Sequence, residues 1–102
     1  ISPSKIENFI CNNEKIKQCL VYGDKKNYLV ALIVVDPKDK NDSTIRNIIE
    51  NLNKNLSIIE KIKKFKLIDE EFTIENGLMT PTLKLKRKKI IEKYQQELEK
   101  LY

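Results

Sequence analysis

The chain has 102 residues, 40% hydrophobic and 34% charged, which predicts one small globular domain with a single core. Its net charge of +5 brings nucleic-acid binding into consideration, but only two of the 20 basic residues are the arginine that sequence-specific readers favour. The lack of histidine excludes Ser-His and Cys-His catalysis, and two cysteines without CxxC spacing exclude a zinc site or a secreted disulfide framework.

The first half of the chain predicts a helix followed by a hairpin. Ser2 and Pro3 suit a helix start, and the apolar residues Ile6, Phe9 and Ile10 follow at helical spacing. Residues 16–22 and 28–35 are predicted strands, joined by a polar tetrapeptide of hairpin length. The second strand is apolar throughout, so we expect both of its faces to be buried.

A second helix is expected from a cap at Asp42 or Ser43, with residues 58–62 adding a turn and residues 65–68 forming a short strand. The apolar stripe of this helix consists of Ile45, Ile48, Ile49, Leu52 and Leu56.

Asn76 and Gly77 mark a tight turn, and residues 85–102 are predicted as one final helix. Its apolar face consists of Ile90, Ile91, Tyr94, Leu98 and Leu101. The predicted fold class is α+β, a small antiparallel sheet with a β-hairpin, flanked by three main helices.

The basic run at residues 84–89 breaks a local rule. Five of its six residues are basic, although they are expected at a helix N-terminus, where the macrodipole is already positive. Such a run, preceded by Thr80, Pro81 and Thr82, would suit a phosphate or carboxylate, but a solvated charged face is an equally good interpretation. Lys84 precedes the amphipathic pattern and could extend from the domain, whereas the other basic residues fit the polar face of the helix.

The segment "GLMTPTLKLKR" at residues 77–87 resembles the C-terminal signature of long-chain, AMP-forming acyl-CoA synthetases, members of the adenylate-forming superfamily. Residues 1–7 resemble the motif that follows the interdomain hinge of this family. The "VYGD" turn with "YLVALIV", and residues 53–67, resemble further segments, and all four lie in the family's order.

The resemblance implies the C-terminal cap domain of a fatty acid–CoA ligase, a mobile lid over residues 1–102. The N-terminal domain that binds ATP and the acyl chain is absent from this chain. It also implies that ATP and CoA are substrates, with Mg2+ bound alongside ATP mainly by that N-terminal domain. The partners implied are this domain of the same polypeptide, a fatty acid, ATP and CoA, without nucleic acid.

By the same resemblance, Lys84 is the catalytic lysine of adenylation, where an ammonium group stabilises the transferring phosphate. Thr80, Thr82 and Lys86 are implied substrate or phosphate contacts, and Lys54 lies on the segment that approaches CoA in relatives.

Two positions qualify the resemblance. Many superfamily members carry glycine where this chain has Leu83, so we expect the lysine loop to be less flexible here. Glu7 matches an acidic residue of the post-hinge motif, although a solvated carboxylate on the first helix is the favoured interpretation.

The first residues lack the pattern expected of a signal peptide, so we expect an intracellular protein, with any membrane association through the rest of the protein. The isolated chain is expected to fold but to be inactive.

Two other functions are considered. One is a nucleic-acid module in which residues 84–89 bind phosphates and Tyr22, Tyr28 or Phe65 stack on bases. The other is a protein-interaction domain that uses the final helix.

Overall fold

A computed structural model describes residues 3–23, 28–56 and 61–102. The elements in chain order are α1 (Pro3–Ile10), β1 (Gln18–Tyr22), β2 (Leu29–Val34), the 3-10 helix η1 (Pro37–Asp39), α2 (Asp42–Asn53), β3 (Ile62–Ile68), α3 (Arg87–Lys93) and α4 (Gln95–Lys100). None of the helices in these described ranges combines the length and apolar character that crossing a bilayer requires.

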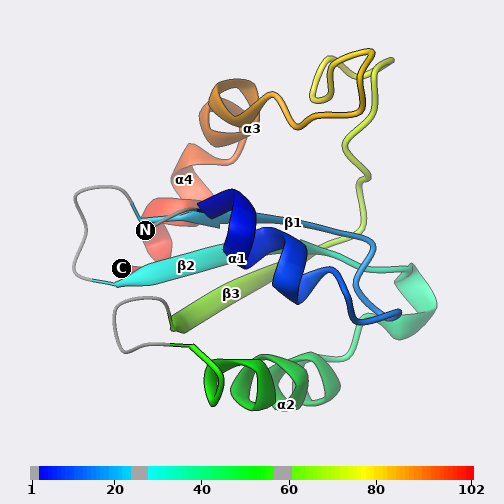
Figure 1. The fold of residues 1–102 in the computed structure, drawn as a ribbon. Helices are drawn as coiled ribbons and strands as arrows, with labels where there is room; N and C mark the ends of the chain where they lie inside the picture. Colours follow the sequence, from blue (N-terminus) through cyan, green and yellow to red (C-terminus); the bar gives the residue numbers. More distant parts are fainter. Residues whose placement is uncertain (1–2, 24–27, 57–60) are drawn as a thin grey trace.

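The three strands form one sheet in the order β1-β2-β3 (Figure 1). The predicted hairpin is confirmed, because β1 and β2 pair antiparallel, from Gln18 opposite Val34 to Tyr22 opposite Val30. However, β3 pairs parallel to β2, so the sheet is mixed and not antiparallel throughout. The reason is the connection: α2 returns the chain to the end of the sheet where β2 began, as a parallel pair requires.

Strand β2 lies at the centre of two hydrophobic clusters, and all six of its residues are buried. On one face, Ala31 and Ile33 pack with apolar residues of α1 and α2. On the other face, Val30, Leu32 and Val34 pack with a second cluster from α3, α4 and the segment after β3. The expectation that this strand is buried on both faces is therefore confirmed.

Helix α2 differs from its predicted boundaries at both ends. Its N-cap is Asn41, whose Oδ1 accepts a hydrogen bond from the Thr44 N–H at 3.2 Å, so neither Asp42 nor Ser43 is the cap. The further turn predicted at 58–62 falls partly on residues 57–60, which lie outside the described residues. Ile62 itself begins β3, and the Asn53 side chain bonds both its N–H and its carbonyl oxygen at 2.9 Å.

The final helix predicted at 85–102 is two short helices, α3 and α4, that meet at Tyr94. Tyr94 has φ −106° and ψ 19°, outside the helical range. Ile90 and Leu98, on either side of it, are fully buried. This apolar stripe is therefore part of the core, which argues against the alternative of an interaction helix.

Candidate functional site

Lys84 lies near the tip of a small hairpin formed by residues 78–86, here called the lysine hairpin. Met79 and Leu85 form an antiparallel bridge, and the Lys86 N–H donates to the carbonyl of Leu78 at 2.9 Å. The Thr80 N–H donates to the carbonyl of Lys84 at 2.8 Å. This pairing keeps residues 84–86 out of the helix, which begins only at Arg87.

The backbone at the tip has a conformation that favours glycine. Leu83 has φ 64°, in the left-handed region, and it is 70% exposed. This conformation gives a physical reason for the glycine expected at this position in related proteins.

The Lys84 side chain is exposed, and no ion pair engages its ammonium group within the part of the chain that the structure describes. The hairpin therefore presents this cation to solvent on an ordered backbone.

The two threonines take part in the turn. The Thr80 hydroxyl lies 2.9 Å from that of Thr82 and also accepts a hydrogen bond from the Lys84 N–H at 3.1 Å. Threonine commonly stabilises turns by such local bonds. Thr80 and Thr82 thus fix the backbone that carries Lys84.

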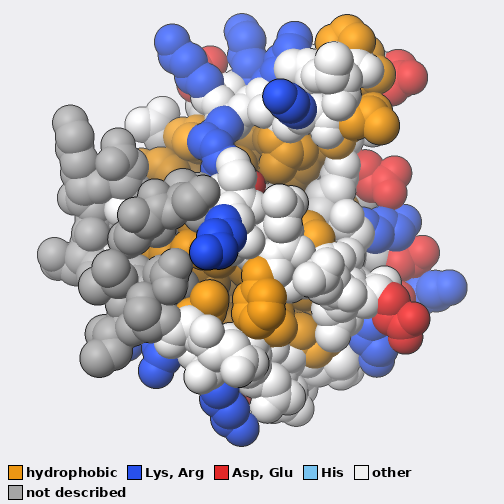
Figure 2. All heavy atoms as spheres, in the orientation of Figure 1, with side chains coloured by type: hydrophobic (Ala, Val, Ile, Leu, Met, Phe, Trp, Pro, Cys, Tyr) orange, Lys and Arg blue, Asp and Glu red, His pale blue; other side chains and the backbone are white. Residues whose placement is uncertain are grey.

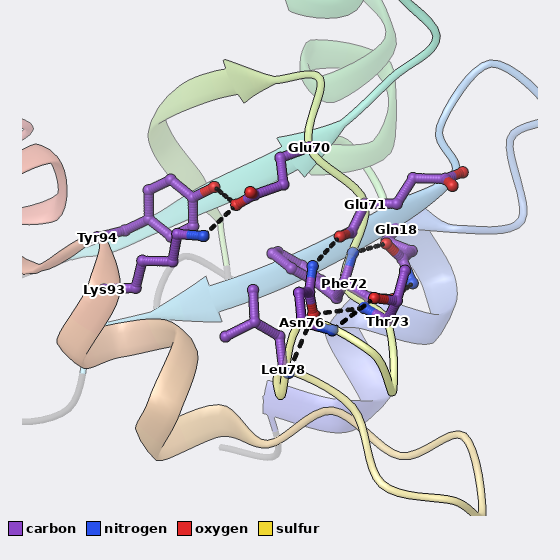
Figure 3. Close-up of polar contacts among 9 residues, drawn as sticks. All are labelled: Gln18, Glu70, Glu71, Phe72, Thr73, Asn76, Leu78, Lys93 and Tyr94. Carbon is purple, nitrogen blue, oxygen red and sulfur yellow. Dashed lines mark hydrogen bonds and ion pairs between the residues drawn. The ribbon is translucent and has the colours of Figure 1, made fainter.

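The incoming end of the lysine hairpin is fixed by a network of side-chain amides (Figure 3). Asn76 Oδ1 accepts from the N–H groups of Thr73 and Leu78, and its amide nitrogen donates to the Glu71 carbonyl at 2.7 Å. Gln18 of β1 bonds both backbone polar groups of Phe72, at 2.7 and 3.0 Å. The predicted turn at Asn76 is confirmed, and the next residue, a glycine, has φ 78°.

The outgoing end is fixed by an ion pair between Arg87 and Glu7. The two nitrogens Nη1 and Nη2 of Arg87 donate to Oε2 and Oε1 of Glu7, each at 2.7 Å. Glu7 is only 6% exposed, so the expectation that it is a solvated carboxylate is wrong. Arg87 is likewise not a free member of the helix surface, and its bond to Glu7 raises the pKa of its guanidinium.

This ion pair was not found from the sequence, because its partners are 80 residues apart. One available signal is that Arg87 is one of only two arginines in a chain whose other 18 basic residues are lysine. Arginine is the residue suited to a two-pronged, partly buried ion pair.

A groove of about 570 Å3 lies beside the ion pair, lined by residues of α1, β1 and the lysine hairpin. Its lining includes Lys84 and Leu83 from the tip, and Cys11. Burial, together with the charge of Glu7, raises the pKa of the Cys11 thiol to about 11. The thiol is therefore protonated at neutral pH and is a poor nucleophile.

The structure separates the remaining candidate residues. Lys86, the last residue of the lysine hairpin, is exposed at the N-cap of α3, and Figure 2 shows further basic side chains gathered over α3. Lys54 is exposed at the C-cap of α2, which lies at the opposite end of the view from α3 (Figure 1). Lys54 therefore does not join the same site as Lys84.

Metal ligands do not cluster in residues 3–23, 28–56 and 61–102, where no group of three or more acidic or cysteine side chains could enclose an ion. In these ranges the described site consists of ammonium, hydroxyl and backbone groups, which suit an anionic ligand.

All 102 residues match the family model described as the AMP-binding enzyme C-terminal domain. A long-chain-fatty-acid–CoA ligase 5 of Mus musculus is 32% identical, with the whole chain aligned to 18% of that protein. The long-chain-fatty-acid–CoA ligase FadD15 of Mycobacterium tuberculosis is 30% identical, with the whole chain aligned to 21% of it. The chain thus spans about a fifth of the length of these curated relatives.

Among solved structures, the adenylation domain of a carboxylate reductase from Mycobacterium chelonae superposes with a TM-score of 0.89. That match covers all of this chain and 18% of the other, at 29% sequence identity. The likeness extends over the lysine hairpin and both clusters of the core, since no part of the chain is left outside it.

Proposed function

The chain belongs to the AMP-binding enzyme C-terminal domain family, and on that premise we propose that it is the mobile catalytic lid of an AMP-forming fatty acid–CoA ligase. The N-terminal domain of the same polypeptide would hold ATP, its Mg2+ and the fatty acid. In the first step a carboxylate oxygen attacks the α-phosphorus of ATP. The bond between this phosphorus and the oxygen that bridges to the β-phosphate breaks, and pyrophosphate leaves. In the second step the CoA thiol loses its proton and attacks the acyl carbonyl, and AMP leaves.

The observation that carries this proposal is the placement of Lys84. An exposed ammonium group without an ion-pair partner in the described part of the chain lies near the tip of a hairpin whose two ends are both fixed. Such a group can enter a site formed by another domain and stabilise charge on the phosphate as it transfers. A preorganised cation acts there without the cost of reordering its own backbone.

Other candidate residues have supporting roles in the proposal. Thr80 and Thr82 set the turn. Thr82 and Lys86 are exposed and lie two residues on either side of Lys84, so they would contact the phosphates as well. Lys54, on the other side of the molecule, would contact CoA when the lid has rotated for the second step.

The nucleic-acid alternative gains no support. The curated relatives reported above are named as long-chain-fatty-acid–CoA ligases. The four tyrosines are engaged within the fold, since Tyr102 donates to the Tyr28 carbonyl at 2.8 Å and Tyr28 donates to the Leu101 carbonyl at 2.9 Å. Tyr22 and Tyr94 bond glutamates.

The proposal is tested with the full-length polypeptide and fatty-acid-dependent exchange of pyrophosphate into ATP. Lys84→Ala is expected to lower exchange by about 100-fold or more, as does the loss of one transition-state donor. Lys88→Ala, an exposed cation on α3, is the matched control and should leave exchange near the wild-type rate. Equal exchange in Lys84→Ala and wild type, or robust exchange by the 102-residue chain alone, would rule the lid out.

A further inference from the structure

The ion pair between Glu7 and Arg87 also supplies a partner for the outer edge of the sheet. Strand β1 is an edge strand, and Val21 lies within it. The Val21 N–H donates to Glu7 Oε2 at 2.6 Å, and Arg87 Nη1 donates to the Val21 carbonyl at 3.2 Å. The two side chains therefore take the place of a neighbouring strand, which satisfies backbone groups at the sheet edge.

These contacts connect three elements at one point. Glu7 belongs to α1, Val21 to β1, and Arg87 begins α3 directly after the lysine hairpin. A two-pronged arginine–carboxylate contact fixes both distance and orientation, which a single ammonium contact does not.

Arg87 directly follows the outgoing strand of the lysine hairpin. Leu85 and Lys86 are paired with Met79 and Leu78, and Lys84 accepts a backbone bond from Thr80. Arg87 is therefore connected to the tip through the paired strands.

The other anchors of the lysine hairpin lie on a different face. Leu78 and Ile90 belong to the hydrophobic cluster shared with α3 and α4, whereas α1 packs in the opposite cluster. The Glu7–Arg87 contact is thus the polar connection that sets the lysine hairpin relative to α1.

We infer that Glu7 and Arg87 are positioning residues for adenylation, which orient the lysine hairpin so that Lys84 meets the transferring phosphate correctly. This inference rests on the proposed function. Misplacement of a reacting group by about 1 Å can lower a rate 100-fold. Loss of the two-pronged Arg87–Glu7 contact should therefore lower adenylation kcat by about 10- to 100-fold. The KM for ATP is expected to stay near its wild-type value, since Lys84 acts on the transition state and not on ground-state binding.

The experiment compares Arg87→Lys and Glu7→Gln with wild type in the full-length polypeptide. Arg87→Lys keeps the positive charge but loses the two-pronged contact with Glu7. It should also disturb folding less than Glu7→Gln. The matched control is Lys93→Gln, which removes another ion pair of α3, Lys93 with Glu70 at 2.6 Å, without touching α1 or the lysine hairpin. Adenylation kcat and KM, and thioester formation from supplied acyl-AMP, are measured well below each melting temperature.

The inference predicts a lower adenylation kcat in both variants, with near-normal KM, near-normal thioester formation and a normal control. An unchanged adenylation kcat in Arg87→Lys, or an equal fall of both half-reactions, would overturn it. Lys84→Ala in the same assay separates the two proposals. If Lys84→Ala is inactive in adenylation while Arg87→Lys is normal, only the positioning role fails. If Lys84→Ala adenylates normally, the proposed function fails too.

Discussion

Replacing Arg87 by methionine removes the guanidinium while keeping an unbranched apolar stem that can pack in the same place. The change leaves the Glu7 carboxylate, whose side chain is 8% exposed, with the Val21 N–H and without its cation. Removing one partner of a buried ion pair costs about 3–5 kcal/mol, because the remaining charge is neither paired nor hydrated. We expect Arg87→Met to lower the free energy of unfolding by about that amount.

The converse change should cost less. In Glu7→Gln the stranded charge is that of Arg87, whose side chain is 34% exposed and can be hydrated in part. Glutamine also keeps an oxygen that can accept from the Val21 N–H. A loss of about 1–3 kcal/mol is expected, between the values for exposed and buried pairs. The double variant should cost less than the two single losses added together, because its partners are in contact.

The assay is urea unfolding of the 102-residue chain and its three variants, followed by circular dichroism. A chain of this length is expected to have a total stability of about 5–15 kcal/mol, so each loss is measurable. Single losses below about 0.5 kcal/mol, the range of ordinary surface changes, would refute the reasoning. So would a Glu7→Gln loss larger than that of Arg87→Met.

Three other predictions concern the backbone at Leu83 and Gly77 and the partly buried thiol of Cys11. Leu83→Gly should raise the free energy of unfolding by about 0.5–1 kcal/mol. The change relieves left-handed backbone strain and loses little packing, because Leu83 is 70% exposed, while the greater conformational entropy of glycine in the unfolded chain offsets part of the gain. Gly77→Ala should lower the free energy of unfolding by about 1 kcal/mol, because Gly77 has φ 78°. Urea unfolding in which the two variants change stability in the same direction would contradict these predictions. Alkylation of Cys11 by iodoacetamide in a Cys19→Ser variant should rise up to about pH 11, because burial raises its pKa. An alkylation rate that stops rising near the pKa of an ordinary thiol would contradict this raised pKa.

Local patterns in the sequence predicted most of the elements. Helical spacing of Ile6 and Ile10 located α1, and the uninterrupted apolar run located β2 and its burial on both faces. The Asn76 turn followed from the known preferences of asparagine and glycine. These features depend on neighbours within a few residues, which a sequence displays directly.

Features that depend on distant residues were not predicted. The parallel pairing of β3 depends on where α2 returns the chain, and the spacing of apolar residues does not report strand direction. The Glu7–Arg87 contact joins positions 80 residues apart. Leu83 adopts a left-handed conformation that leucine disfavours, so only the tertiary setting of the lysine hairpin could reveal it.

The candidate site was predicted in part. Lys84 was set apart from the other basic residues by its place before the amphipathic pattern, and it does lie outside the helix, near the hairpin tip. The anion site expected at a helix N-terminus stays a prediction, and α3 begins at Arg87, three residues after Lys84. The Lys84 ammonium group is carried by the lysine hairpin. Helix α3 follows the hairpin and holds its outgoing end through the Arg87–Glu7 ion pair.

The most direct test of the account separates the two half-reactions of the full-length polypeptide carrying Lys84→Ala. The proposed function predicts that acyl-AMP formation falls by about 100- to 1,000-fold. Thioester formation from supplied acyl-AMP should stay within about twofold of wild type, because the role proposed for the lysine is in the first step alone. An equal fall in both half-reactions, or an unchanged rate of acyl-AMP formation, would contradict it.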